Sequence, residues 1–179
     1  DQMVREIIRA DAKDPPSAGA AFWLSKRLEN YGQNAVDYSA LTRDAGRLFL
    51  GKDFRCCECH DHLFIDDYKQ QHFQGLHTFF KNVYLVNAAK MLVAEKVTAE
   101  KTPFASVFTK VPMTTGPSLP GLMMVDIPVF PKGMEFTVAP DRKTNEPGVP
   151  KFSTRAALAE QLPTAKNPDF ARNAVNRLW

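Results

Sequence analysis

Residues 56–60 read Cys-Cys-Glu-Cys-His, and the interpretation of the whole chain starts from them. The stretch contains the pattern Cys-x-x-Cys-His, in which two thiols three positions apart can form thioethers with the two vinyl groups of one porphyrin. The histidine after the second cysteine is then delivered to the iron as its proximal ligand. The pattern therefore predicts one covalent haem c, held by Cys56 and Cys59 and ligated by His60.

The residue types that bind metals are confined to one short window. All three cysteines and all four histidines lie within residues 56–77. Zinc is an alternative, because Cys56, Cys59, His60 and His62 provide two thiolates and two imidazoles. Their spacing argues against it, since zinc fingers and ribbons separate the two ligand pairs by about a dozen residues or more. A disulfide is a further alternative, although it would leave one of the three cysteines unpaired.

The second axial position of the iron has several candidates. His62 is too close to His60 to reach the opposite face of the macrocycle, so it is interpreted as a hydrogen-bond donor or a partner of a haem propionate. His72 and His77 lie on the helix expected next, and His72 points more directly towards its apolar face, which makes His77 the weaker candidate. A methionine or an open site is the remaining alternative. The methionines considered are Met91, Met113, Met123, Met124 and Met134.

Two phenylalanines beside the motif are candidates for the lining of a haem pocket. Phe54 precedes the cysteines and Phe64 follows the histidines. Ordinary packing of amphipathic helices would account for these aromatic side chains equally well.

The chain is expected to be mainly α-helical and to consist of three segments. Residues 1–83 form a helical domain that carries the motif, because apolar residues recur there at helical spacing. Residues 84–152 form a connector that is partly β and partly irregular, since residues 103–150 hold nine of the thirteen prolines. Residues 153–179 begin a second helical domain, in which Asn167-Pro168 is a good cap and first-turn pair.

The bulk composition sets broad limits. A chain of 179 residues with 44% apolar content can bury a core, and a net charge of +3 is too small to argue for binding to nucleic acid. No apolar run approaches the length of a membrane span, and no signal peptide begins the chain. Thioether attachment normally follows export, and both ends run into expected helices. We therefore expect an internal segment of a longer exported polypeptide, periplasmic or on the cell surface.

The motif and its surroundings carry a family resemblance. Residues 47–51 (Arg-Leu-Phe-Leu-Gly), the motif itself with His62, and the closing Phe79-Phe80 resemble the cytochrome-c-like domain of planctomycete surface and periplasmic proteins. Three C-terminal runs look like the opening of the second domain usually paired with it. These runs are residues 155–159, 167–172 and 175–179. The resemblance implies the middle of a large exported multidomain protein.

Three functions follow from these observations. The first is an electron-transfer cytochrome module, which would work with a redox partner protein or a neighbouring haem domain of the same polypeptide. The second is a structural or binding module of a cell-surface assembly, in which haem or zinc staples a small core. The third is a haem peroxidase or oxidase, which needs an open sixth position and a distal acid or base.

Overall fold

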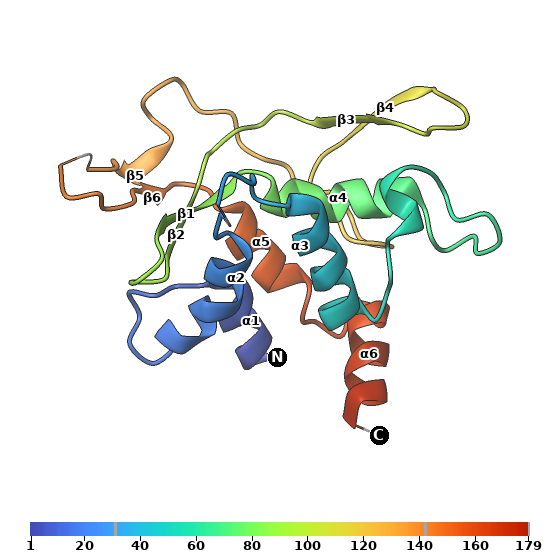
Figure 1. Ribbon diagram of the computed structural model, residues 1–179, viewed down its shortest axis with the longest axis horizontal. Helices are drawn as coiled ribbons and strands as arrows, with labels where there is room; N and C mark the ends of the chain where they lie inside the picture. Colours follow the sequence, from blue (N-terminus) through green and yellow to red (C-terminus); the bar gives the residue numbers. More distant parts are fainter. Residues whose placement is uncertain (31, 142, 179) are drawn as a thin grey trace. The chain divides into compact units, whose positions relative to one another are not determined.

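The computed structural model describes residues 1–178 except residues 31 and 142 (Figure 1). This part of the chain contains six α-helices and three two-stranded antiparallel sheets. The fold is therefore mixed α and β, and the prediction of a mainly α protein is wrong. None of the described helices combines the length and the apolar character that crossing a bilayer requires.

The strands are short and three of the six described ones contain proline, so the sequence predicted only a connector that is partly β and partly irregular. Strands β3 (Thr102–Ala105), β4 (Pro112–Thr115) and β6 (Val149–Pro150) each include one proline. Every strand of a two-stranded sheet has an open edge, where the missing N–H of proline costs no ladder bond. Strands this short also show too few positions for an apolar and polar alternation. The segment expected as a connector thus folds as hairpins.

The chain divides into two compact units, and each unit draws on all three segments expected from sequence. The first unit comprises residues 1–37, 82–99 and 127–160, and the second comprises residues 38–81, 100–126 and 161–179.

The first unit combines helices with two hairpins. Its elements are α1 (Gln2–Arg9), the 3-10 turn η1 (Ala18–Ala20), α2 (Ala21–Arg27), β1 (Val83–Asn87), β2 (Leu92–Glu95), β5 (Phe136–Val138), β6 and α5 (Thr154–Gln161). Strand β1 pairs with β2, and β5 pairs with β6. The apolar side chains of Ile8, Leu24, Val83 and Leu158 are fully buried or nearly so. Burial of such side chains is the main favourable term that holds the unit together.

The second unit carries the motif. Its elements are α3 (Tyr38–Ala45), the π-helical turn η2 (Gly46–Leu50), the 3-10 turn η3 (Cys56–Glu58), α4 (Gln70–Phe80), β3, β4 and α6 (Pro168–Leu178). Its core is rich in aromatic residues, and Phe54, Phe73, Phe79 and Phe80 are each at most 1% exposed. Strands β3 and β4 form a hairpin, and Thr102 of β3 shares a buried hydrogen bond of 2.7 Å with Thr78 of α4.

Two glycines shape the approach to the motif. A Cβ atom on Gly46 would lie only 2.6 Å from Cδ2 of Phe54, so a side chain there would collide with the core. Gly51 ends the π-helical turn with a φ of +65°, a conformation that glycine adopts without strain. The chain is thereby redirected so that the cysteines follow on a separate short turn.

Candidate functional site

The motif folds as one tight turn. The backbone N–H groups of Cys59 and His60 both donate to the carbonyl oxygen of Cys56, each at 3.3 Å. The side chains of Cys56 and Cys59 are exposed, whereas Cys57 between them is fully buried, and all three thiols are free. The two cysteines of the predicted attachment site are therefore accessible, and the third is not.

The tautomer of His60 follows from the hydrogen bond of its Nδ1. Its Nδ1 lies 2.6 Å from the carbonyl oxygen of Asp61. A carbonyl oxygen can only accept, so Nδ1 carries the proton and Nε2 keeps its lone pair. Histidines that bind metals usually donate the other ring N–H to a carbonyl or carboxylate in this way. The ring also lies against Phe108, with 4.7 Å between the ring centroids.

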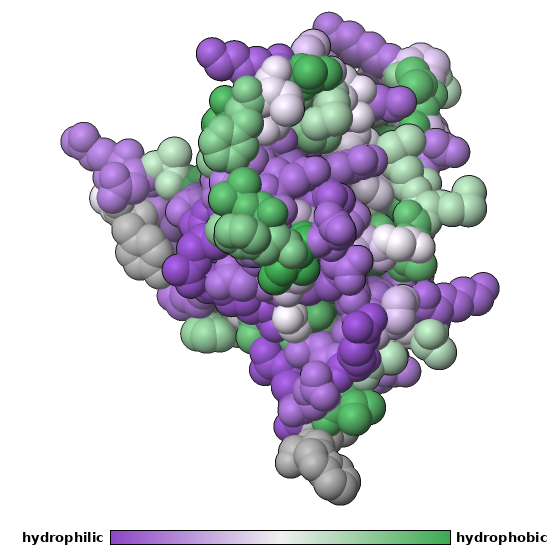
Figure 2. Space-filling view, turned by 90° about the vertical axis from the view of Figure 1, so that its right-hand side faces the viewer, coloured by the Kyte–Doolittle hydropathy of each residue, from purple (hydrophilic) through white to green (hydrophobic). Residues whose placement is uncertain are grey.

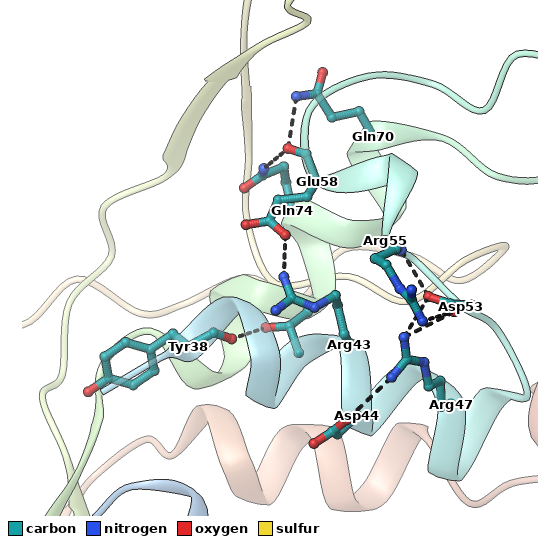
Figure 3. A network of polar contacts seen from close by, with 10 residues as sticks. Tyr38, Arg43, Asp44, Arg47, Asp53, Arg55, Glu58, Gln70 and Gln74 are labelled. Carbon is teal, nitrogen blue, oxygen red and sulfur yellow. Dashed lines mark hydrogen bonds and ion pairs between the residues drawn. The ribbon is translucent and has the colours of Figure 1, made fainter. Parts of the chain in front are cut away.

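Glu58, in the middle of the motif, ties the turn to two helices (Figure 3). Its carboxylate forms an ion pair with Arg43 of α3. Its carbonyl oxygen accepts hydrogen bonds from the side-chain amides of Gln70 and Gln74 on α4, both at 3.3 Å. Glu58 therefore holds the turn in place through both its side chain and its backbone carbonyl.

The β3–β4 hairpin supports the same turn from another direction. The backbone N–H of Val107 donates to the carbonyl oxygen of Cys59 at 3.0 Å. The buried amide of Gln70 donates to Ala105 as well as to Glu58, at 3.1 Å to the Ala105 oxygen. A single side chain thus links the turn and the hairpin.

A second polar group in Figure 3 surrounds Asp53, just before the motif. The Asp53 carboxylate binds the guanidinium of Arg47 at 3.0 Å and accepts from the backbone N–H of Arg55 at 3.1 Å. Burial alone would raise the pKa of Asp53, but these two partners lower it below its ordinary value. The segment that leads into the motif is therefore anchored by a carboxylate that stays ionised.

His62 has a structural role that differs from that of His60. Its Nδ1 accepts hydrogen bonds from the backbone N–H groups of Phe64 and Ile65, at 3.2 and 3.1 Å. Its own backbone N–H donates to the carbonyl oxygen of Tyr68 at 2.8 Å. Because Nδ1 is an acceptor, Nε2 carries the proton and can donate to an anionic group. This tautomer has no lone pair left for a metal.

The two histidines of α4 lie in different surroundings. Nδ1 of His72 lies 3.0 Å from the carbonyl oxygen of Asp67 and 3.4 Å from the backbone N–H of Lys69, so both a protonated and an unprotonated Nδ1 have a partner. Nδ1 of His77 is buried without a hydrogen-bond partner, and the His77 ring stacks on Phe73. Burial lowers the pKa of both histidines, so both favour the neutral form.

The zinc alternative finds no matching arrangement in the described part of the chain. No group of three or more histidine, cysteine, aspartate or glutamate side chains there lies close enough to hold a metal ion. In addition, His62 Nδ1 is used by its own loop, where it accepts from the backbone N–H groups of Phe64 and Ile65.

The two phenylalanines expected near a haem have opposite environments. Phe54 is fully buried beneath the turn, whereas Phe64 is 90% exposed. Phe64 belongs to a group of exposed apolar side chains in the motif loop and at the tip of the β3–β4 hairpin, which we call the apolar rim. The apolar rim consists of Leu63, Phe64, Ile65, Val107, Phe108 and Val111. Figure 2 shows apolar side chains, in green, among charged ones on this side of the molecule.

Sequence reasoning missed a polar cavity of about 260 Å³ in the same unit. Lys52 and Asp169 line it and form an ion pair at 2.9 Å. Tyr68, whose ring lies 5.5 Å from the ammonium group of Lys52, forms another wall. Burial raises the pKa of Tyr68 above its ordinary value. The sequence signal was Asp169 itself, an acidic residue in the first turn of a helix, where it usually interacts with the helix dipole.

Comparison with known proteins supports the coarse part of the resemblance. Residues 1–84 match the family PSCyt2, described as a protein of unknown function (DUF1549), a planctomycete-associated domain. No curated protein and no solved structure matches the chain at a significant level. The match includes the whole motif and its scaffold on α3 and α4, and it ends before β3. Trp179, the last residue of the C-terminal resemblance, lies outside the described residues.

Proposed function

We propose that the chain is a c-type cytochrome module of an exported, periplasmic or cell-surface, multidomain protein, and that it transfers electrons. Cys56 and Cys59 would hold one haem through thioether bonds, and His60 would bind its iron through Nε2. When bound, a haem c supplies an iron that alternates between two oxidation states. The proposal includes the cytochrome-c-like part of the family resemblance.

One observation carries this proposal. Two exposed thiols sit on a single turn, and the histidine that follows has Nδ1 committed to the Asp61 carbonyl, so that Nε2 is the ring nitrogen free to bind a metal. These are the three groups that attachment of a haem c requires, in the protonation state that ligation requires. The donor set of the turn therefore fits the group.

The surroundings of the turn suit a flat apolar group with charged edges. The apolar rim would shield such a group from water, which is one way proteins tune a redox centre. Nε2–H of His62 would be available to a propionate, because Nδ1 is used inside the loop. The bonds from Arg43, Gln70 and Gln74 to Glu58 keep the turn in place, so little ordering is needed on attachment.

The test is covalent haem incorporation in a host that exports the chain together with a haem-attachment system. We expect a c-type pyridine haemochrome and a haem that remains on the chain in a denaturing gel. Cys56→Ala and Cys59→Ala should each reduce the covalent haem strongly, because one thioether is lost. Cys57→Ala is the matched control, because Cys57 is buried on the same turn, and it should retain haem. Folded, exported wild-type protein without covalent haem would overturn the proposal, provided that a reference cytochrome is loaded in parallel.

The apolar rim also favours a second candidate function, a binding module of a surface assembly. Six exposed apolar side chains in two neighbouring loops are more than scattered surface residues. The distinguishing variant is Cys56→Ala/Cys59→Ala. If it folds and still joins the native assembly, haem is not needed for the interaction, and the binding role is the better description.

A further inference from the structure

The first unit contains a cavity of about 330 Å³ that is separate from the motif. It is lined by the turn after α1, by β2, by residues 147–150 around β6 and by the start of α5. These segments are gathered from distant parts of the sequence, as their different colours in Figure 1 show. The volume lies at the lower end of the range for small-molecule sites, about 300 to 1,000 Å³.

Glu95, at the end of β2, is a buried carboxylate with one satisfied and one unsatisfied oxygen. Its side chain is only 3% exposed. Oε2 accepts hydrogen bonds from the backbone N–H of Thr154 at 3.1 Å and from the Thr154 hydroxyl at 2.9 Å, and so caps α5. Oε1 is buried without a hydrogen-bond partner.

Arg155 presents a complementary unsatisfied donor beside this oxygen. Its Nη1 donates to the carbonyl oxygen of Arg9 at 2.5 Å, but its buried Nε has no hydrogen-bond partner. Nε lies 3.9 Å from Oε1 of Glu95, which is too far for a hydrogen bond. Both residues line the cavity, and the side chain of Arg155 is 12% exposed. A buried acceptor and a buried donor of opposite charge therefore stand side by side as an ion pair, and neither atom has a hydrogen-bond partner, an arrangement that is rare in folded proteins.

The pair defines the chemistry of a ligand. The ligand must donate a hydrogen bond to Glu95 and accept one from Arg155, and it must make both bonds with the same edge. A primary carboxamide does so, because its N–H and C=O lie on the same side. A trans peptide group cannot, because its N–H and C=O point in opposite directions. A carboxylate would be repelled by Glu95, and an amidinium would be repelled by Arg155. Apolar walls from Leu92, Val93 and the prolines at 147 and 150 suit a small ring attached to the amide.

We propose that this cavity binds a small molecule through a primary carboxamide, with Glu95 Oε1 as the acceptor and Arg155 Nε as the donor. The proposal does not depend on haem, because its residues belong to the unit that does not contain the motif.

The test uses probes of nearly the same shape that differ in hydrogen bonding. Benzamide offers a donor and an acceptor, benzoate offers two acceptors, and benzamidine offers only donors. We expect benzamide to bind the full chain at least about tenfold more tightly than either charged analogue, as expected for one mismatched polar contact. Backbone NMR shifts should change at Val93, Glu95 and Arg155. 2-Pyridone is a ring lactam whose N–H and C=O also lie on one edge. Comparing its binding with that of benzamide would distinguish a ligand with the amide inside a ring from one with an open carboxamide.

The Glu95→Gln variant is expected to reverse the preference. Its side-chain oxygen can still cap α5 while its amide nitrogen replaces the acceptor by a donor, so benzoate should then bind better than benzamide. Glu29→Gln is the matched control, because Glu29 is in the same unit and does not line the cavity. The proposal is wrong if no probe binds the wild-type chain or if a charged analogue binds best. If Glu95→Gln does not fold, the ranking of the probes on the wild-type chain decides.

Discussion

Lys52 and Asp169 form an ion pair at 2.9 Å whose side chains are only 14% and 9% exposed. Lys52 follows the π-helical turn, and Asp169 lies in the first turn of α6. The residues expected to open a separate domain therefore complete the unit that carries the motif. Phe170, beside Asp169, is 9% exposed and belongs to the same core.

Removing one partner of this pair should destabilise the second unit. Asp169→Asn would leave the ammonium group of Lys52 poorly solvated and unpaired, and we expect a loss of about 1–3 kcal/mol in the free energy of unfolding, less than for a fully buried pair. Urea unfolding measures this change in the free energy of unfolding. Asp66→Asn is the matched control, because its pair with Lys69 is exposed and should contribute less than about 0.5 kcal/mol. Equal effects of the two variants would contradict the role of the pair.

Gln70 should be the main polar anchor of the motif turn. It is 2% exposed and binds both Glu58 and Ala105, so Gln70→Ala should cost about 1–3 kcal/mol through the loss of two part-buried hydrogen bonds, with Glu58 keeping its bond from Gln74. The amide of Val107 should also exchange its hydrogen faster, because the turn and the hairpin separate more often. Hydrogen exchange and thermal unfolding check both effects. The adjacent, exposed Gln71 provides the control Gln71→Ala, which should leave both nearly unchanged.

The three cysteines should differ in reactivity before any haem is attached. Iodoacetamide at pH 8 should modify the exposed Cys56 and Cys59 in the native chain and leave Cys57 unmodified. In urea all three should react. Mass spectrometry of the intact chain counts the additions. Rapid modification of Cys57 under native conditions would show that the turn does not bury it.

Because the Cys57 thiol is buried, we expect the protein to lose stability at high pH. Burial raises the pKa of Cys57 from 9.0 to about 11. The unfolded chain loses this proton first, so the stabilising contribution is complete below about pH 9 and is lost as the pH rises towards 11. Burial raises the pKa of Tyr38 and of Tyr68 and acts in the same direction. Urea midpoints between pH 8 and 11 test this prediction. Cys57→Ala should flatten the pH dependence, and the control Cys59→Ala should not.

In haem-loaded protein, His72 is expected to be the second axial ligand. Its Nδ1 lies 3.0 Å from the carbonyl oxygen of Asp67, and in the tautomer that donates there Nε2 is the ligating nitrogen. His72→Ala should therefore convert a low-spin optical spectrum to a high-spin one that binds carbon monoxide. His77→Ala is the comparison, since His77 stacks on Phe73 and lacks such a partner. A spectrum that His72→Ala leaves low-spin would point to a methionine or to His77. A wild-type protein that binds carbon monoxide readily would favour the peroxidase or oxidase alternative.

Local features were largely predictable from the sequence. Residues 38–50 lie in the segment expected to be helical, and they form α3 followed by η2, which ends at Gly51. The helices expected at 153–162 and after Asn167 are also present. Capping residues, glycine and apolar periodicity act within a few residues of chain, so their effects can be read from a single segment.

Side-chain partners were not predictable in the same way. Nothing in the spacing of His60 and His62 indicated that one would donate from Nδ1 while the other accepts there. The link from Gln70 to the hairpin could not be predicted, because the partners Glu58 and Ala105 lie far from Gln70 and on opposite sides of it in the sequence. The prolines inside strands were misleading, because only the sheet topology shows that every strand has an open edge.

The sequence by itself determined the spacing of Cys56, Cys59 and His60 on which the proposed attachment rests, and it predicted the helical character of the segment that holds them. These depend on covalent spacing and on interactions between near neighbours. Only the tertiary structure decided which thiol is buried, which histidine nitrogen keeps its lone pair, and that Glu95 and Arg155 meet unsatisfied in a cavity. Burial and hydrogen-bond partners arise from segments far apart in the chain, so they exist only once the chain has folded.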